Sequence, residues 1–237
     1  NWPRVAARVA AALHRGRKIK LYLSPLSTQI DNRDSYAELF DNLRRIHLIL
    51  LGLCQDFWRY ISDGLLRQKA VAGEVGSSTM PQKINPIHFE NAEGNLQLSD
   101  ALFTFFSAKL PLSRLQRDLS DSTVLRNMGV AFGYALVAYT SLAEGLERVS
   151  FNRALAKAQL ARHPEVLAEV IQTILRAAGH EKPYEQLKSL TRGRTITQED
   201  LQVFIENLQV EPVIKNKLRA LSVFNYTGLA AQRARGK

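Results

Sequence analysis

Residues 34–66, DSYAELFDNLRRIHLILLGLCQDFWRYISDGLL, decide the fold class of this chain of 237 residues. Apolar side chains recur in the stretch at the three- and four-residue spacing that places them on one face of an α-helix. Asp34 and Ser35 are residues that favour a helix start, and no proline interrupts the next nine or so turns. A helix of this length normally belongs to a bundle, so the stretch predicts long helices that pack side by side.

The rest of the chain repeats the helical pattern between glycine and proline breakers. A loop is predicted over residues 68–86, and helices over about 87–108 and 121–148, with a pause at 109–113. After residue 149 the helical pieces become shorter, with breakers at 163–164, 179–183, 192–197 and 211–212. We therefore predict an all-α fold, in which a long-helix bundle domain (residues 1–149) is followed by a small all-helical C-terminal domain (residues 150–237).

The charge of the chain suggests an acidic partner, because the formal net charge is +10. Nucleic acid, an anionic membrane and a small polyanion all fit the charge. The basic residues gather at the chain ends without the aromatic side chains that stack bases, which favours a solvated surface over a nucleic-acid arm. The longest apolar run, residues 48–54, is too short to span a membrane, and the N-terminus does not read as a signal peptide. With Cys54 as its single cysteine, the chain is expected to be cytoplasmic, without a membrane or nucleic-acid partner.

The loop predicted between the first two long helices contains the polar string GSSTMPQKINP, residues 76–86. Its glycine and serines supply flexible backbone, hydroxyls and N–H groups that suit an anion. Lys83 adds a positive charge, and Asn85 adds a neutral donor and acceptor before Pro86. The residues therefore predict a site that binds a carboxylate and acts on the carbon beside it. The alternative is that these are turn residues that cap the next helix.

The string resembles the G-S-S-x-M-P-x-K-x-N-P sequence of the fumarase/aspartase superfamily, whose members release fumarate or a related product by β-elimination. The resemblance implies that Ser77 is the general base that removes a proton from the carbon next to a carboxylate. It also implies that Ser78, Lys83 and Asn85 stabilise the negative charge that develops, with Ile84 in contact with the substrate. Two more residues are implied by the match that continues into the following helix: Glu90 as the partner of a catalytic histidine, and Asn91 as a substrate contact. Glu90 could equally be a first-turn helix acid.

A second polar segment, QRDLSDSTVLR at residues 116–126, indicates which substrate is bound. If a helix begins near Asp121, Ser122 and Arg126 lie on one face of its first turns, and Arg117 arrives from the preceding loop. A hydroxyl and two guanidiniums at a helix N-terminus suit a phosphate. The alternative is that Ser120 or Asp121 caps the helix and Arg117 pairs with a neighbouring acid. The segment is similar to the one that grips the nucleotide phosphate in adenylosuccinate lyases, which implies substrate contacts from Arg117 and from residues 122–126 (Ser122, Thr123, Val124, Leu125 and Arg126).

Two further stretches carry the resemblance to the bacterial-type adenylosuccinate lyases. SPLSTQID, residues 24–31, matches a region whose glutamine, Gln29, contacts the substrate, and residues 182–197 look like the small C-terminal domain. The resemblance implies cleavage of adenylosuccinate to AMP and fumarate, and of the matching succinyl-carboxamide ribotide of purine synthesis. It implies neither a metal nor an organic cofactor. It also implies a homotetramer whose active sites are shared between subunits.

The sequence departs from this family pattern in two ways. Gln82 stands where these enzymes commonly have histidine, and none of the five histidines falls in the motif of the general acid. The chain therefore resembles only the C-terminal half of such an enzyme, and we expect activity only from a complete one. Three alternatives remain at this point: argininosuccinate lyase or another fumarate-releasing enzyme, a basic helical nucleic-acid-binding module, and a non-catalytic interaction protein derived from the fold.

Overall fold

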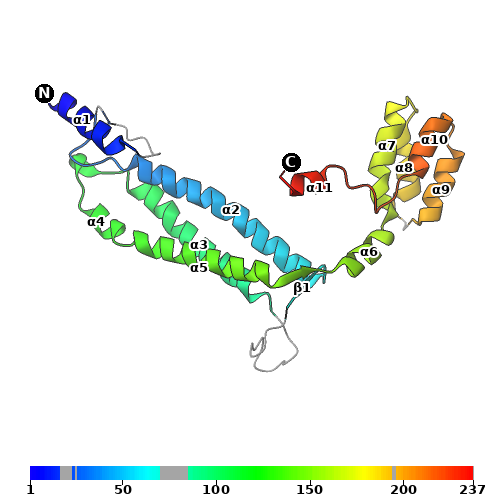
Figure 1. The fold of residues 1–237 in the computed structure, drawn as a ribbon, viewed down its shortest axis with the longest axis horizontal. Helices are drawn as coiled ribbons and strands as arrows, with labels where there is room; N and C mark the ends of the chain where they lie inside the picture. Colours follow the sequence, from blue (N-terminus) through cyan, green and yellow to red (C-terminus); the bar gives the residue numbers. More distant parts are fainter. Residues whose placement is uncertain (17–22, 25, 70–84, 194–195, 237) are drawn as a thin grey trace, which may run out of the picture. The chain divides into compact units, whose positions relative to one another are not determined.

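The computed structural model describes residues 1–16, 23–24, 26–69, 85–193 and 196–236. The chain forms two compact units, which Figure 1 draws as ribbons. Residues 1–61 and 68–149 make up the first unit, and residues 62–67 and 150–237 make up the second. Helices dominate both units, so the predicted all-α class is confirmed.

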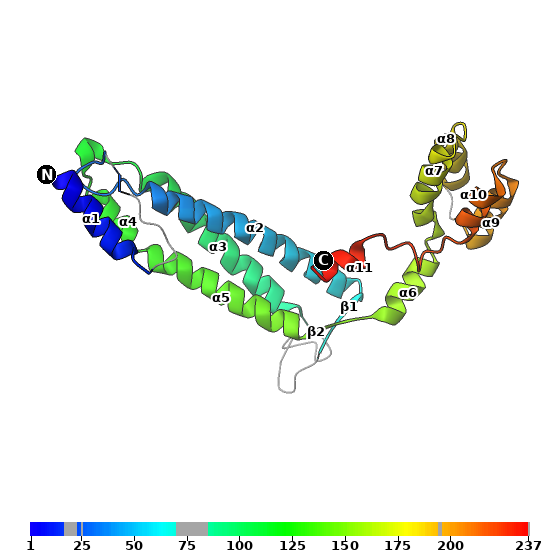
Figure 2. The same ribbon diagram turned by 45° about the horizontal axis from the view of Figure 1, so that its top comes forward.

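Three long helices form the first unit: α2 (Asp34–Ser62), α3 (Ile87–Lys109) and α5 (Met128–Glu147). They run side by side in Figures 1 and 2. α2 begins where the carbonyl of Arg33 accepts the N–H groups of Tyr36 and Ala37. It ends before Gly64, whose φ of 74° is a conformation that favours glycine. The periodicity of the sequence thus located this helix to within four residues at its end.

Apolar side chains between the three helices make two separate core clusters. The first lies at the α4 end of the bundle and contains Phe40, Phe103, Phe106, Leu110, Val124 and Ala131. Its rings pack closely, with Phe40 and Phe103 stacked at 5.2 Å between centroids. The second lies toward the other end and contains Cys54, Phe89, Ala92, Leu96, Ala138 and Leu142. Small residues in α5 let the helices approach, since a Cβ on Gly145 would meet the Cβ of His88 at 3.0 Å.

A polar layer separates the two clusters. His47 of α2 is fully buried and makes a polar contact with one residue of each of the other long helices. Its Nδ1 lies 2.6 Å from Oδ1 of Asp100 in α3, and its Nε2 lies 2.5 Å from the hydroxyl of Tyr139 in α5. A neutral ring satisfies both contacts if Nδ1–H donates to the carboxylate and Nε2 accepts from the hydroxyl. One side chain therefore links all three long helices.

Three features of residues 1–151 differ from the sequence prediction. The basic N-terminus contains a helix, α1 (Trp2–His14), capped by the Asn1 side chain. A short strand, β1 (Leu66–Gln68), pairs with β2 (Val149–Phe151), where only loop and helix were expected. The helix expected over 121–148 is divided into α4 (Ser120–Leu125) and α5, because the Asn127 side chain bonds the Thr123 carbonyl at 2.9 Å and takes up one acceptor of the helix end. A 3₁₀ turn, η1 (Arg114–Gln116), precedes α4.

The second unit is a group of short helices around its own core. The helices are α6 (Arg153–Ala161), η2 (Pro164–Leu167), α7 (Ala168–Ala177), α8 (Pro183–Thr191), α9 (Gln198–Asn207), α10 (Pro212–Arg219) and α11 (Ala230–Ala234). Prolines occupy the first position of α8 and α10, and Thr197 and Asp200 form a capping box on α9. The predicted breakers thus lie at helix boundaries. The core includes Ile171, Leu175, Leu201 and Leu218.

No helix within the described residues combines the length and the apolar character needed to cross a membrane. The same part of the chain holds no group of three or more histidine, cysteine or carboxylate side chains that could hold a metal ion.

Candidate functional site

Four of the predicted site residues lie outside the described residues: Ser77, Ser78, Lys83 and Ile84. The structure resumes at Asn85, whose carbonyl accepts a hydrogen bond of 3.1 Å from the Gln68 side chain. Pro86 occupies the N-cap position of α3 and makes no side-chain cap hydrogen bond. The alternative, in which the polar residues before Pro86 cap the helix, falls mostly on residues 77–79, which lie outside the described residues.

Glu90 and Asn91 lie in the first turn and a half of α3, where both are exposed. Glu90 accepts a hydrogen bond of 3.0 Å from the indole Nε1 of Trp58 in α2. The neighbouring histidine, His88, faces the opposite helix and lies 3.4 Å from Oε2 of Glu144 in α5. The geometry leaves the carboxylate of Glu90 at the surface. Its predicted histidine partner is thus not supplied by His88.

The amide of Asn91 is held in place by its neighbours. Its Nδ2 donates to the Ser141 hydroxyl at 3.2 Å, and that hydroxyl donates to the His88 carbonyl at 3.0 Å. Asn95, one turn further on, donates to Oδ1 of Asn91 at 2.8 Å. Asn91 also lines a surface hollow between α3 and α5, together with His88, Ser141 and Glu144. The side chain is therefore oriented before any ligand arrives, as a binding residue requires.

The second predicted segment, residues 116–126, lies at the other end of the bundle (Figures 1 and 2). Arg117 and Arg126 are exposed, and the described residues offer neither guanidinium an ion-pair partner. The neighbouring acid, Asp118, pairs with Arg114 at 2.8 Å instead of Arg117. Hydrogen bonds from Arg114 hold the pKa of the Asp118 carboxyl well below its usual range. Both arginines thus remain available to an anion.

The expected helix geometry of this segment is wrong in one respect. Ser122 and Arg126 were expected on the first turns of a long helix, but α4 has only six residues, and Arg126 is at its C-terminal end. The Ser122 hydroxyl donates to the Leu119 carbonyl at 2.8 Å. A phosphate here would therefore be held by side chains, without help from the N-terminus of a long helix.

The remaining residues of the segment differ in what they can offer a ligand. Thr123 is exposed, whereas Val124 is buried in the apolar cluster of the first unit and Leu125 packs against that cluster. A ligand could reach Val124 only through its backbone. Gln29 is exposed in the irregular segment before α2, next to a turn in which the Thr28 hydroxyl donates to the Ile30 carbonyl at 2.7 Å.

Apart from Gln29, the predicted site residues that the structure describes form two groups at opposite ends of the bundle. Asn85, Glu90 and Asn91 lie at the start of α3, whereas residues 117–126 follow its end at Lys109. The rise of 1.5 Å per helical residue separates Glu90 from Lys109 by about 30 Å along the axis. A single small substrate cannot touch both groups in one chain. Within the described residues, the candidates therefore fall into two half-sites, one at each end of the bundle.

Two polar features of this unit had no place in the sequence prediction. One is the buried network around His47, and the other is an ion pair between Arg33 and Asp121. A histidine inside the apolar run of α2 is a signal that could have drawn attention to the first. The sequence holds no comparable signal for Arg33, because its partner lies 88 positions away.

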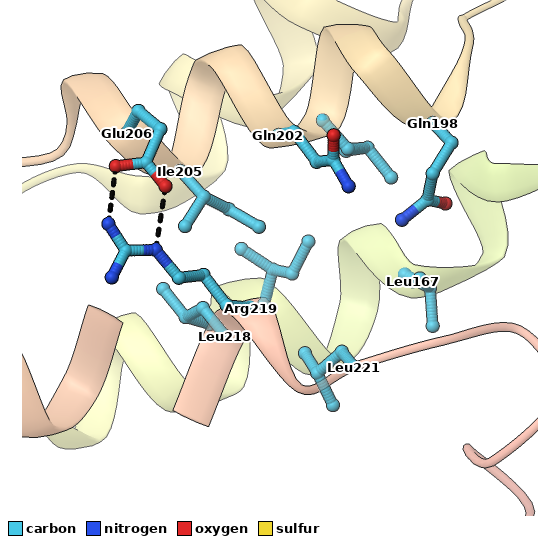
Figure 3. A pocket seen from close by; sticks show the side chains of 10 residues that line it. Leu167, Gln198, Gln202, Ile205, Glu206, Leu218, Arg219 and Leu221 are labelled. Carbon is cyan, nitrogen blue, oxygen red and sulfur yellow. Dashed lines mark hydrogen bonds and ion pairs between the residues drawn. The ribbon is translucent and has the colours of Figure 1, made fainter. Parts of the chain in front are cut away.

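A hollow of about 310 Å³ in the second unit contains none of the predicted residues. Figure 3 shows its apolar lining, which includes Leu167, Leu218 and Leu221, and the amides of Gln198 and Gln202. The carboxylate of Glu206 receives two hydrogen bonds, of 2.6 and 2.5 Å, from the guanidinium of Arg219 beside it. Glu206 and Arg219 thus neutralise each other, and the side chains that line the hollow include no reactive group.

Comparison with known proteins identifies both parts of the chain. Residues 113–227 match the family model described as adenylosuccinate lyase C-terminal, and residues 2–97 match the one described as lyase. The curated adenylosuccinate lyase of Legionella pneumophila is 52% identical over 212 residues, which cover 90% of this chain and 46% of the relative. Those of Vibrio cholerae and Escherichia coli are 49% and 50% identical, over 88% and 87% of the chain. The chain spans less than half the length of these relatives.

A solved structure supports the fold. The class II fumarase of Schistosoma mansoni superposes with a TM-score of 0.59 at 15% sequence identity, over 86% of this chain and 44% of the fumarase chain. At this identity the likeness concerns the fold alone. Together with the sequence matches, it confirms the resemblance expected from residues 76–86 and 116–126. The chain belongs to the adenylosuccinate lyase family and corresponds to the C-terminal part of its members.

Proposed function

We propose that the complete protein cleaves adenylosuccinate to AMP and fumarate, and acts likewise on the succinyl-carboxamide ribotide of purine synthesis. The observation that carries this proposal is the pair of exposed guanidiniums, Arg117 and Arg126, in a chain of this family. Neither has an ion-pair partner within the described residues, and the same segment contains the Ser122 hydroxyl. Two guanidiniums and a hydroxyl suit a phosphate, which adenylosuccinate carries and argininosuccinate lacks. The other fumarate-releasing reactions therefore fit these residues less well.

The reaction is a β-elimination, and the proposal gives each group one role. Ser77 takes the proton from the carbon next to a carboxylate of the succinyl group, and the electrons left on that carbon form the double bond of fumarate as the C–N bond breaks. Lys83 and Asn85 stabilise the negative charge on the carboxylate while the proton is absent. A histidine from outside this chain's motifs returns a proton to the leaving nitrogen. No metal or organic cofactor takes part in this scheme.

The active site is proposed to form between copies of the protein in a homotetramer. The two half-sites lie about 30 Å apart along α3, so the start of α3 in one chain must meet residues 117–126 of another. Exposed apolar side chains on all three long helices, such as Ile49, Phe105 and Leu136, are the kind of surface that a helical partner covers. The residue ranges 1–149 and 150–237 are proposed as the central bundle domain and the C-terminal domain. The cysteine content fits a reducing compartment, so a cytoplasmic location is included.

The test of the reaction uses the full-length enzyme and follows fumarate by its absorbance. We expect turnover of adenylosuccinate and none of argininosuccinate. Ser77→Ala should abolish turnover while the enzyme still binds substrate. Near-normal turnover by this variant would reject the serine as the base, and turnover of argininosuccinate alone would reject the substrate.

The phosphate assignment has its own test. Arg126→Ala should raise the Michaelis constant for adenylosuccinate by about tenfold or more, because a charge-assisted bond to the phosphate is lost. Arg114→Ala is the matched control, since Arg114 lies in the same segment but its guanidinium is engaged with Asp118. Equal Michaelis constants for the two variants would reject the assignment.

A further inference from the structure

An ion pair joins two segments of the first unit that are 88 residues apart. The guanidinium of Arg33, directly before α2, donates to the carboxylate of Asp121 in α4. The side chains are only 14% and 8% exposed, so both charges are largely removed from water. Such a pair adds little net stability compared with apolar residues of the same shape. The ion pair is therefore expected to act mainly by fixing the relative position of the two segments.

The helix that carries Asp121 has few other means to hold its position. A helix of six residues is not stable by itself, and at its start Leu119 offers no side-chain cap, although the Asp118 carboxylate accepts the N–H of Ser120 at 2.9 Å. Its two buried residues are Asp121 and Val124, which lie three positions apart and hence on one face. Val124 anchors the helix to the apolar cluster of the first unit. Leu125 packs partly against the same cluster, so the apolar contacts hold α4 on one side only, and the ion pair adds a fixed point at the start of α2.

The rotation of α4 determines where its ligand-facing groups point. Ser122 follows Asp121 directly, and each step along a helix turns the side chain by about 100°. Arg126 lies one turn after Ser122, at the end of α4. If Asp121 lost its partner, the face with Ser122 and Arg126 would no longer be held toward the solvent in one orientation. The ion pair thus acts on the two groups proposed to hold the phosphate without touching the phosphate itself.

Arg33 is itself held firmly, so it can serve as a reference point. Its N–H donates to Oδ2 of Asp31 at 3.1 Å, and its carbonyl accepts the first N–H groups of α2. Its φ of 58° lies in the left-handed region, which turns the chain from the Gln29 segment into the helix. The position of α4 is therefore tied to the longest helix of the bundle.

We propose that Arg33 is a positioning residue that orients Ser122 and Arg126 toward the substrate phosphate through its ion pair with Asp121. This inference rests on the proposed function, because it assigns the phosphate to α4. Arg33 and Asp121 do not contact the substrate in this scheme. Their removal should therefore weaken phosphate-dependent binding and leave the chemical step nearly intact.

The experiment compares AMP with adenosine as ligands of the full-length enzyme, together with steady-state kinetics on adenylosuccinate. For Arg33→Met we expect AMP to bind about tenfold more weakly, since a misplacement of about 1 Å has effects of this size or larger. Adenosine affinity and kcat should change by about twofold at most. Asp121→Asn should give the same pattern, and Arg33→Lys should restore part of the AMP affinity because it keeps the charge.

Arg219→Met is the matched control, because it also removes an arginine from an ion pair, in the second unit. It should leave the ratio of AMP to adenosine affinity unchanged. A purely structural role for Arg33 predicts equal losses for AMP and adenosine, and this outcome, or an unchanged AMP affinity, would overturn the inference. If the Arg33→Met variant loses its helical circular dichroism, the ratio of AMP to adenosine affinity is measured instead on the isosteric Asp121→Asn variant, with the same expected and contradicting outcomes. Absence of adenylosuccinate turnover in the unsubstituted enzyme would instead reject the proposed function.

Discussion

Replacement of Tyr139 by phenylalanine tests the buried polar layer of the bundle. The substitution keeps the ring and removes only the hydroxyl that lies 2.5 Å from Nε2 of His47. Because His47 is fully buried, no water can replace the lost partner. The imidazole is then left with an unsatisfied nitrogen in the core. We expect the free energy of unfolding to fall by about 1–3 kcal/mol.

Urea unfolding followed by tryptophan fluorescence measures this change in the first unit. Both tryptophans, Trp2 and Trp58, lie in that unit, so the signal does not report on the second unit. For a loss of about 2 kcal/mol and a slope of about 2–3 kcal/mol per molar urea, the midpoint should fall by nearly 1 M. The protein concentration must be equal in all samples, since association would shift the midpoint.

Two further variants make the result specific to the network. Tyr134→Phe removes a hydroxyl from the same helix, and no hydrogen bond to that hydroxyl is found within the described residues, so its midpoint should stay constant. In a His47→Leu background, Tyr139→Phe should cost little, because its partner is already gone. The double-mutant cycle should then give a coupling of about 1 kcal/mol or more. A midpoint for Tyr139→Phe equal to that of the unsubstituted protein, or a zero coupling, would refute the reasoning.

Three other predictions concern the same unit. Burial raises the pKa of the Cys54 thiol to about 11, with the nearby Glu93 carboxylate as a second cause. A thiol reagent should therefore label Cys54 only after urea unfolds the bundle. Rapid labelling of the native protein would contradict its burial. Gly133→Ala should stabilise the protein by up to about 1 kcal/mol, because the added Cβ would meet no neighbour. Gly145→Ala should destabilise it by about 1–2 kcal/mol, since the added Cβ would press on α3. Thermal unfolding of both variants measures the difference, and equal shifts in melting temperature would contradict the close approach of the helices. Burial raises the pKa of the Asp100 carboxyl above its unfolded value of about 3.9. The contribution of this group to stability is therefore fully present below that value and is lost as the pH rises through the folded pKa. The advantage of the unsubstituted protein over Asp100→Asn should shrink from acidic to neutral pH, and a constant difference in urea midpoints would speak against it.

Local patterns predicted most of the helices but not their interruptions. The period of apolar residues located α2 and α3, because both helices bury one face along their whole length. The break between α4 and α5 contains neither glycine nor proline at Arg126 and Asn127, and it depends on a side-chain bond that the folded chain makes. The strands β1 and β2 have three residues each and pair across some 80 positions, so a short window of sequence cannot reveal them.

The motifs predicted candidate site residues, but not how one chain distributes them. Asn85 and Arg126 are 41 positions apart in the sequence, and a loop and a helix could have brought them together. The structure instead inserts the whole of α3 between the two groups. The partners of Arg33 and His47 were equally hidden, since they lie 88, 53 and 92 positions away. Contacts of this kind follow from the packing of the bundle rather than from any local pattern.

The separation of the two half-sites along α3 makes folding and activation different events. In the homotetramer proposed above, a chain can complete its helices and its core while no active site yet exists, because the other half comes from another copy. On the proposed assembly, dilution should therefore lower the activity per chain while the helical circular dichroism stays constant. The enzyme would then respond to its own abundance, with specific activity rising as newly made chains find one another.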